Sequence, residues 1–343
     1  MRYYPSVAQC TRGEDCTVRF VPLTHRRTIR TFSTNAASIH RAVYLAVIAV
    51  RVARKEDFFM FGAESTDMAE PVLYEVQPEE AIARITLNRP DKLNALSSAV
   101  IDGVESGIHR AENDDAVRVV VVTGAGDEAF SAGYDIESNK RDDPIPTVDE
   151  SLDAFEAAVG HVHAVWDCHK PVIAAVDGYC LAGGSDLAMA CDLVVATESS
   201  QFGYPGLRMG GVPPTLIYPF VMHLHQAKEL LFSGKAIGAE RARDIGMVNH
   251  VVPRGELMAA VRREVAEIRK MPGNNVRILK HVVNGIAEGQ GLQPTFKYSE
   301  LFNALGHQTE YGREFYRILG EDGLDAALTF MNEQDKGMDN PNG

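Results

Sequence analysis

The chain has 343 residues, 45% of them apolar and 24% charged, which is typical of a soluble globular protein with one large domain and appendages or with two domains. Its net charge of -13 is unevenly distributed: residues 1–55 carry ten basic and two acidic residues, whereas the remainder carries 24 basic and 45 acidic residues. An acidic body argues against nonspecific nucleic-acid binding, although a few cations and helix N-termini can still bind one anionic ligand.

Cysteine and histidine give no sign of a disulfide framework or a metal site. The cysteines form no CxxC pair, and we interpret them as reduced thiols, the last three of them buried: Cys10, Cys16, Cys168, Cys180 and Cys191. Histidines alternate at His161/His163 and at His223/His225, a spacing that shares one face only on a strand. Both pairs lie in sequence of helical character, so no zinc site is predicted.

Residues 1–68 differ from the rest in being rich in arginine and poor in acidic residues. One interpretation is a mitochondrial presequence, since Arg30-Thr31-Phe32-Ser33 resembles a processing site. The other, which we favour, is a poorly ordered extension, or a start codon assigned too early with Met60 or Met68 as the true beginning. We therefore expect a cytoplasmic protein, with the mitochondrial matrix as the alternative.

The longest apolar segment, Ala42 to Val50, is shorter than the roughly 20 residues that cross a bilayer, so no membrane partner is expected.

A regular pattern of strands and helices begins at Pro71. The residues Ile82–Leu87 alternate as in a strand, and Asn88-Arg89-Pro90 ends it. Ser97–Glu112 has its apolar residues at helical spacing. The β-branched run Arg118–Thr123 is too continuously apolar for a half-exposed strand, so it should be buried on both faces.

The following segments continue this alternation. A polar loop, a helix and two buried strands are expected in that order: Ser138–Thr147, Val148–Cys168, Pro171–Val176 and Leu193–Ala196. Strands that alternate with helices imply right-handed crossovers and a mostly parallel sheet. After Phe202 the expected elements are helices: Leu216–Phe232, Ala239–Ile245, Glu256–Arg269, Val276–Ala287 and Thr295 onward. The sequence therefore predicts an α/β core at residues 69–270 and a helical C-terminal region at residues 271–343.

The run Gly124-Ala125-Gly126-Asp127-Glu128-Ala129 matches GxGxxA directly after a strand, which is the outline of a dinucleotide-binding fingerprint. In that motif the glycines open a long helix. Here Phe130-Ser131-Ala132-Gly133-Tyr134-Asp135 follows at once and indicates a second tight turn. We therefore do not favour an oxidoreductase that uses a nicotinamide cofactor.

Two stretches suit the polarisation of a thioester carbonyl, which requires two backbone N–H groups that converge on one oxygen. They are Ala132-Gly133-Tyr134 and Ala182-Gly183-Gly184, and their small residues let backbone approach a ligand closely. The second stretch precedes an apolar helix, whose dipole would face the developing negative charge. Taken alone, each stretch could also be a loop whose glycines permit unusual backbone angles.

Several motifs in one order resemble the enoyl-CoA hydratase/isomerase (crotonase) family over about residues 71–340. They are Thr86 to Leu96 (TLNRPDKLNAL), Val122 to Gly126, Phe130 to Asp135, Lys170 to Tyr179, Ala242 to Asn249, and Lys280. The resemblance implies a spiral of ββα units with a helical C-terminal region. It also implies an acyl-CoA thioester substrate, no separate cofactor besides the coenzyme A of that substrate, and a homotrimer or hexamer.

The resemblance also assigns site residues. The oxyanion N–H groups would come from Tyr134 and Gly183. The wall near the CoA adenine would be formed by four residues: Leu93, Ala95, Leu96 and Ala132. Lys280 maps to a region that can approach the CoA phosphates.

The chain departs from the family pattern at both carboxylate positions. The first glutamate of hydratases maps to Asp186, and the second maps to Gly206 in Phe202-Gly203-Tyr204-Pro205-Gly206, where no carboxylate remains. Addition of water to a C=C bond needs one group to accept a proton and another to donate one, whereas a single base can move a double bond. Asp186 is therefore the expected acid/base, although it could instead cap its helix.

Neighbouring residues offer substitutes for the missing carboxylate and shape the pocket. Tyr204 and Arg208 are the polar candidates, and Tyr134 is bulky where small residues are common. Hydration or double-bond isomerisation is the leading interpretation. An acyl-CoA hydrolase, cleaving a thioester or a C–C bond on the same scaffold, and a catalytically silent protein that binds CoA or a partner are the alternatives.

Overall fold

The computed structural model describes residues 3–10, 16–22, 70–136 and 148–337. The chain divides into two compact units, Met1–Met68 and Ala69–Gly343. In the first unit, strands β1 (Tyr3–Cys10) and β2 (Cys16–Pro22) pair as an antiparallel hairpin, in a stretch where the sequence led us to expect no regular element. The processing site expected at residues 30–33 and the alternative start residues at positions 60 and 68 lie outside the described residues.

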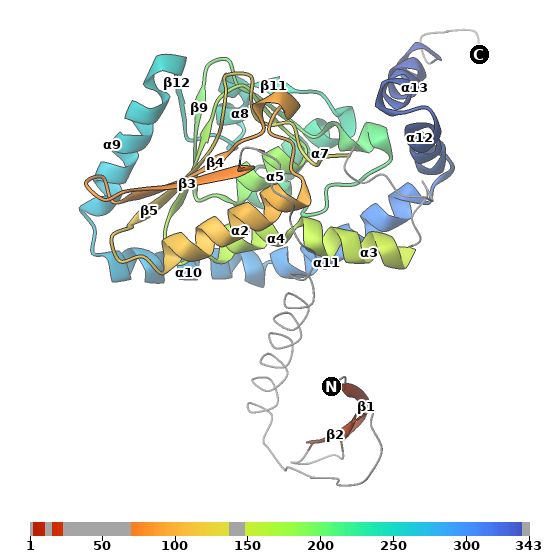
Figure 1. Cartoon of the computed structure of the whole chain (residues 1–343), viewed down its shortest axis with the longest axis horizontal. Coiled ribbons are helices and arrows are strands. Elements are labelled where there is room, and N and C mark those ends of the chain that lie inside the picture. Colours follow the sequence, from red (N-terminus) through yellow and green to blue (C-terminus); the bar gives the residue numbers. More distant parts are fainter. Residues whose placement is uncertain (1–2, 11–15, 23–69, 137–147, 338–343) are drawn as a thin grey trace. The chain divides into compact units, whose positions relative to one another are not determined.

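A six-stranded sheet forms the centre of the second unit (Figure 1). Its strands are β3 (Val72–Gln77), β4 (Ile82–Leu87), β5 (Val119–Gly124), β7 (Val172–Val176), β9 (Leu193–Thr197) and β12 (His250–Val252). They lie in the order β12-β9-β7-β5-β4-β3, with β3 antiparallel to β4 and all other neighbours parallel. The expected mostly parallel sheet is confirmed.

Helices cover both faces of this sheet, which is why its strands are apolar on both sides. On one face, the strands pack against α2 (Ser98–Glu112), α4 (Gly160–Asp167) and α5 (Gly183–Ala190). On the other face they pack against α9 (Leu257–Arg269), through buried residues such as Val261. Figure 1 shows α2 and α4 together on one side of the strands and α9 on another.

A second sheet of four short strands lies beside the first, in the order β11-β10-β8-β6. These strands are β6 (Ala129–Ser131), β8 (Tyr179–Leu181), β10 (Gln201–Gly203) and β11 (Ile237–Gly238). None exceeds three residues, too few for the alternation by which a strand is found in sequence. The turns at the ends of β6, β8 and β10 carry the candidate site.

The helices after residue 147 follow the expected pattern with two corrections. The helix expected at Val148–Cys168 is broken into α3 (Val148–Ala158) and α4, where Gly160 lies against the Glu105 side chain of α2. The helix expected at Leu216–Phe232 is broken into α6 (Tyr218–Val221) and α7 (Leu224–Ser233), because the backbone is extended at Met222. The remaining helices are α8 (Ala239–Asp244), α10 (Gly273–Gly289), α11 (Leu292–His307), α12 (Glu310–Glu321) and α13 (Leu324–Gly337), with 3-10 helices η1 (Pro90–Lys92), η2 (Pro205–Met209) and η3 (Arg254–Glu256).

The second unit is thus a mixed α/β fold with a helical C-terminal region, as expected. Within the ranges that the structure describes, no helix is both long and apolar enough to cross a membrane.

Candidate active site

The two stretches with candidate N–H groups lie against each other. Gly133 adopts a φ of +107°, a conformation that favours glycine. A Cβ atom placed on Gly133 would lie 2.7 Å from the Cβ of Ala182 and 3.2 Å from the backbone nitrogen of Gly183. The turn after β6 and the start of α5 are therefore in contact, and glycine is what allows this approach.

The backbone N–H groups of Tyr134 and Gly183 are not used by the fold. A parallel bridge joins Leu96 to Tyr134 through the carbonyl of Gly133 and the N–H of Asp135, which leaves the Tyr134 N–H outside the bridge. Gly183 is the first residue of α5, where N–H groups have no acceptor within the helix. Among the described residues, neither N–H group has a hydrogen-bond acceptor.

The residue before Gly183 is held in a strained conformation. Ala182 has φ 47° and ψ -122°, values that a residue with a side chain adopts only at a free-energy cost on the order of 1–3 kcal/mol. Its N–H donates to the carbonyl of Gly203 at 2.9 Å, and its own carbonyl accepts from the N–H of Asp186 at 3.0 Å. These two bonds fix the peptide that carries the Gly183 N–H.

Asp186 is completely buried in the first turn of α5. Burial raises the pKa of its carboxyl group to about 7, and the hydroxyl groups of Tyr218 and Thr215 oppose this rise. Both hydroxyls face the carboxylate, but neither is close enough to donate a hydrogen bond to it. The two carboxylate oxygens and the two hydroxyls therefore have no hydrogen-bond partner among the described residues. The carboxylate also accepts no N–H of its helix, so the geometry does not support a capping role.

Three tyrosines lie near Asp186, and a histidine packs against one of them. The ring of Tyr134 covers Gly183, with Cε2 2.6 Å from the position of an added Cβ. Tyr204 and Tyr218 pack edge to face with ring centroids 6.2 Å apart, and His161 of α4 packs against Tyr134 at the same separation. Burial raises the pKa of all three tyrosines, and the Asp186 carboxylate raises it further, so the phenols are neutral near pH 7.

Burial also lowers the pKa of His161 to about 4, which leaves its imidazole neutral. His161, Thr215 and Tyr218 were not predicted as site residues, because they lie in two segments separated in the chain from the Gly183–Asp186 motif.

The proposed adenine wall is attached to the same turn. The N–H of Ala132 donates to the carbonyl of Leu93 at 2.9 Å, and the N–H of Leu96 donates to the carbonyl of Gly133 at 2.8 Å. The structure thus brings Leu93, Ala95 and Leu96 beside Ala132. Whether this wall contacts adenine stays a prediction.

Asn94 and Arg89 brace this wall, and the sequence had not singled them out. Asn94 has φ 54°, which asparagine tolerates, and its buried amide donates to the carbonyls of Ala125 and Ala129 at 2.9 and 2.7 Å. Arg89 pairs with Asp135 at 2.7 Å. The turn Gly124–Gly126 ends against Asn94 and leads into β6 rather than a helix, unlike a dinucleotide-binding fingerprint.

Lys280 lies apart from these residues. Its side chain is 8% exposed, and its ammonium group pairs with Asp192 at 2.8 Å and donates to the carbonyls of Lys170 and Val165 at 3.2 and 3.4 Å. These three contacts account for its three N–H donors. Contact of Lys280 with the CoA phosphates stays a prediction.

Two of the buried cysteines flank α5. The thiol of Cys180 donates to the carbonyl of Gly184 at 3.5 Å, and that of Cys191, just after the helix, donates to the carbonyl of Leu187 at 3.4 Å. Burial raises the pKa of both thiols. These two and Cys168 are free and buried, as the sequence indicated.

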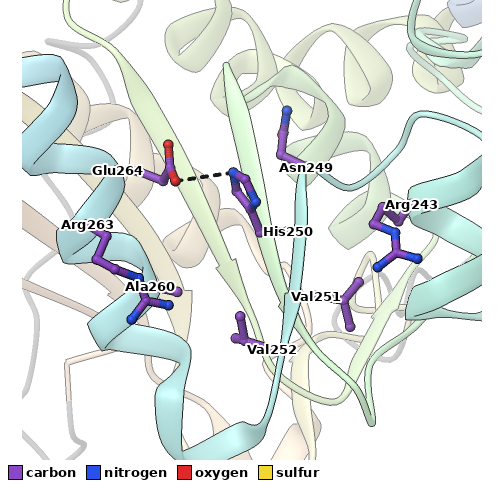
Figure 2. Close-up of a pocket in the computed structure, with 8 residues that line it drawn as sticks. All are labelled: Arg243, Asn249, His250, Val251, Val252, Ala260, Arg263 and Glu264. Atoms are coloured by element: carbon purple, nitrogen blue, oxygen red, sulfur yellow. Dashed lines mark ion pairs between the residues drawn. The ribbon is translucent and has the colours of Figure 1, made fainter.

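Two hollows in the described part of the chain contain none of the predicted site residues. One, of about 210 Å³, lies between β12, α8 and α9, and Figure 2 shows His250 and Glu264 facing each other there with their ion pair of 3.2 Å. A second, of about 450 Å³, lies around Phe220 and His223. Asp186 is enclosed by its neighbours instead, so we assign the site from its chemistry rather than from the hollows.

Comparison with known proteins gives one consistent result. The family described as enoyl-CoA hydratase/isomerase matches residues 77–317. The chain is 31% identical to the short-chain-enoyl-CoA hydratase of Clostridium acetobutylicum over 271 residues, which cover 76% of the chain and 94% of that protein. It is 33% identical to the crotonyl-CoA hydratase of Syntrophomonas wolfei over 218 residues, covering 61% of the chain and 80% of that protein.

Solved structures agree with the sequence relatives. An enoyl-CoA hydratase/isomerase from Xanthobacter autotrophicus Py2 superposes with a TM-score of 0.73 and 32% identity, covering 78% of the chain and 99% of that structure. A carnitinyl-CoA dehydratase from Mycobacterium avium 104 superposes with a TM-score of 0.64 and 31% identity, covering 74% and 98%. These neighbours confirm the fold class that the resemblance implied.

Proposed function

Since the chain belongs to the enoyl-CoA hydratase/isomerase family, we propose that it holds an acyl-CoA thioester with the carbonyl oxygen at the N–H groups of Tyr134 and Gly183. These two N–H groups have no acceptor among the described residues and lie where the turn after β6 contacts the start of α5. They would stabilise the negative charge of an enolate, and the Gly183 group would do so at a helix N-terminus. Backbone hydrogen bonds on either side of each group fix both N–H groups in advance, so little reorganisation would accompany the charge.

Asp186 is the proposed acid/base of the reaction. Its carboxyl group lies one helical turn after Gly183, and burial brings its pKa to about 7. A carboxylate with that pKa can take a proton from carbon and return it at neutral pH. The single observation that carries the proposal is this buried, unpartnered carboxylate beside two unpartnered N–H groups.

Turnover by the full chain tests this assignment. The Asp186→Asn variant should lose at least ~10²-fold in kcat/KM on any enoyl-CoA substrate, while binding of CoA changes little. In the unaltered chain, kcat/KM should rise with pH as one group ionises near pH 7 and then level off, because the base must be charged.

Asp244→Asn, at an exposed aspartate of α8, is the matched control and should keep both the rate and the pH profile. Full activity in Asp186→Asn would remove Asp186 from the mechanism. Release of free CoA during turnover would instead identify a hydrolase.

We also propose that the chain assembles as a homotrimer or hexamer through α10 and α11. Both helices expose a stripe of large apolar side chains: Ile278, Leu279, Val282, Val283 and Ile286 on α10, and Tyr298, Leu301, Phe302 and Leu305 on α11. Their exposed fractions run from 40 to 62%. A continuous apolar stripe of this kind marks a surface that another protein chain covers, and a second copy of this chain is the partner that the family resemblance supports.

A further inference from the structure

Gly206 lies directly against the ring of Tyr204. A Cβ atom placed on Gly206 would lie 2.6 Å from Cε1, 2.9 Å from Cζ and 3.0 Å from the hydroxyl oxygen of Tyr204. Gly206 is not among the residues with positive φ, so its backbone would accept a side chain. The tyrosine ring, rather than the backbone, is what excludes one.

Tyr204 has little freedom to move aside. Its side chain is almost fully buried, with the residue 4% exposed, and its ring packs edge to face on Tyr218. Its hydroxyl donates to the carbonyl of Val212 at 3.4 Å. A carboxylate at position 206 and the ring at position 204 are therefore alternatives that cannot share this space.

We propose that Tyr204 determines the reaction specificity of the site: by filling the space of a second carboxylate, it restricts the enzyme to proton transfers that Asp186 performs alone. This inference rests on the proposed function and narrows it. The substrate class that suits such a site is a 3-enoyl-CoA thioester, whose double bond moves into conjugation with the carbonyl without addition of water.

The proton transfer balances without any further reactant. The Asp186 carboxylate takes a proton from C2, and the electron pair of that C–H bond forms the C1–C2 double bond of a dienolate whose negative charge rests on the thioester oxygen. The protonated Asp186 then gives the same proton to C4. The electrons of the dienolate return to form the C2=C3 bond, the thioester carbonyl is restored, and Asp186 is again a carboxylate.

Among the described residues, Asp186 is the only buried carboxylate, so addition of water finds no second one at its side. It needs one group to take a proton from water while another protonates carbon. Tyr204 is a poor base for that purpose, because burial and then the nearby Asp186 charge raise the pKa of its phenol. Arg208 does not take its place: its guanidinium lies beside Gly234, with Nε 3.3 Å from the position of an added Cβ.

Two substrates and two paired variants test the proposal on the full chain. The unaltered enzyme should isomerise trans-3-hexenoyl-CoA and hydrate crotonyl-CoA at least ~10²-fold more slowly, as expected when one proton-transfer group is missing. Tyr204→Ala/Gly206→Glu, which frees the space and supplies the carboxylate, should raise crotonyl-CoA hydration at least ~10-fold. The matched variant Tyr204→Phe/Gly206→Glu keeps the ring and should show no gain.

The outcomes separate this inference from the proposed function. Fast hydration of crotonyl-CoA by the unaltered chain, or equal hydration by both double variants, would overturn the role of Tyr204 while leaving Asp186 in place. Retained activity in Asp186→Asn would overturn the proposed function itself.

Thermal unfolding provides a test if the glutamate variants fail to fold. Gly206→Ala should lower the Tm of the unaltered chain by several degrees and cost much less in the Tyr204→Ala background, because the ring that it strikes is gone. An equal loss in both backgrounds would show that Tyr204 does not exclude a side chain at position 206.

Discussion

Burial of the Asp186 carboxylate reduces the stability of the fold whenever the group is ionised. Its pKa rises from 3.8, the ordinary value, to about 7 in the folded chain. Between these values the unfolded chain has lost the proton and the folded chain has kept it, so the free energy of unfolding falls as pH rises. The stability associated with the neutral group is fully present below pH 4 and is lost as pH rises through about 7.

Removing this charge should therefore stabilise the protein in a pH-dependent manner. Asp186→Asn should raise the free energy of unfolding at pH 8 more than at pH 5, by about 2–3 kcal/mol given about 1.4 kcal/mol per pKa unit. Denaturant unfolding of both chains at the two pH values measures this difference. An equal effect at pH 5 and pH 8 would mean that Asp186 titrates near its ordinary pKa.

The residues of the site divide into those that the sequence could reveal and those that it could not. Gly183 was found from the run of small residues before a helix, and Asp186 from the family resemblance, which places a carboxylate three residues after that glycine. Thr215 and Tyr218 reach Asp186 from a segment about 30 residues further along the chain, and no spacing in the sequence predicts that contact. The exclusion of a side chain at Gly206 by Tyr204 likewise depends on ring orientation, which sequence does not encode in a readable pattern.

At the scale of elements, the entry into α5 is the part least tolerant of side chains. Gly183→Val should reduce turnover at least ~10²-fold, because its side chain would strike the Tyr134 ring and displace the N–H that we propose binds the thioester oxygen. Steady-state kinetics and Tm should be measured together. Gly255→Val in η3, where an added Cβ meets no atom within 4 Å, is the control. Near-normal turnover in Gly183→Val would mean that the thioester oxygen does not bind at the N–H groups of Tyr134 and Gly183.

The apolar stripes of α10 and α11 lead to a prediction about assembly. Val282→Asp combined with Phe302→Asp should shift the protein from an oligomer to a monomer, since both side chains are more than half exposed within their stripes and a charge there opposes burial. Light scattering at micromolar concentration gives the mass. Arg277→Asp, on α10 outside the stripe, should leave the oligomer intact. A monomer mass for the unaltered chain would contradict the proposal.

The long elements of the fold could be predicted from sequence because their apolar residues recur. The strand Ile82–Leu87 was predicted with its observed bounds, and the helix expected at Ser97–Glu112 begins one residue later. The breaks at Gly160 and Met222 were missed because the apolar pattern continues across them. Tertiary contacts, rather than local propensity, decide where those helices stop.

At the scale of the whole molecule, residues 69–343 form a compact unit with a buried apolar core of its own. A chain that starts at Met68 should therefore keep the Tm and the activity of the full chain, because the apolar contacts that stabilise the fold are retained. Calorimetry and turnover of the two chains provide the comparison. Loss of soluble folding in the shorter chain would show that the first 67 residues contribute to the core.

The two thiols that flank α5 could report local opening of the structure around the candidate site. Cys180 and Cys191 are buried and bonded to carbonyls of the helix that carries Gly183 and Asp186. An alkylating reagent reaches a buried thiol when the structure around it opens locally, so the labelling rate measures how often the surroundings of α5 open. An acyl-CoA thioester that binds across the start of α5 would slow this labelling, and occupancy could then be read by mass spectrometry without any turnover.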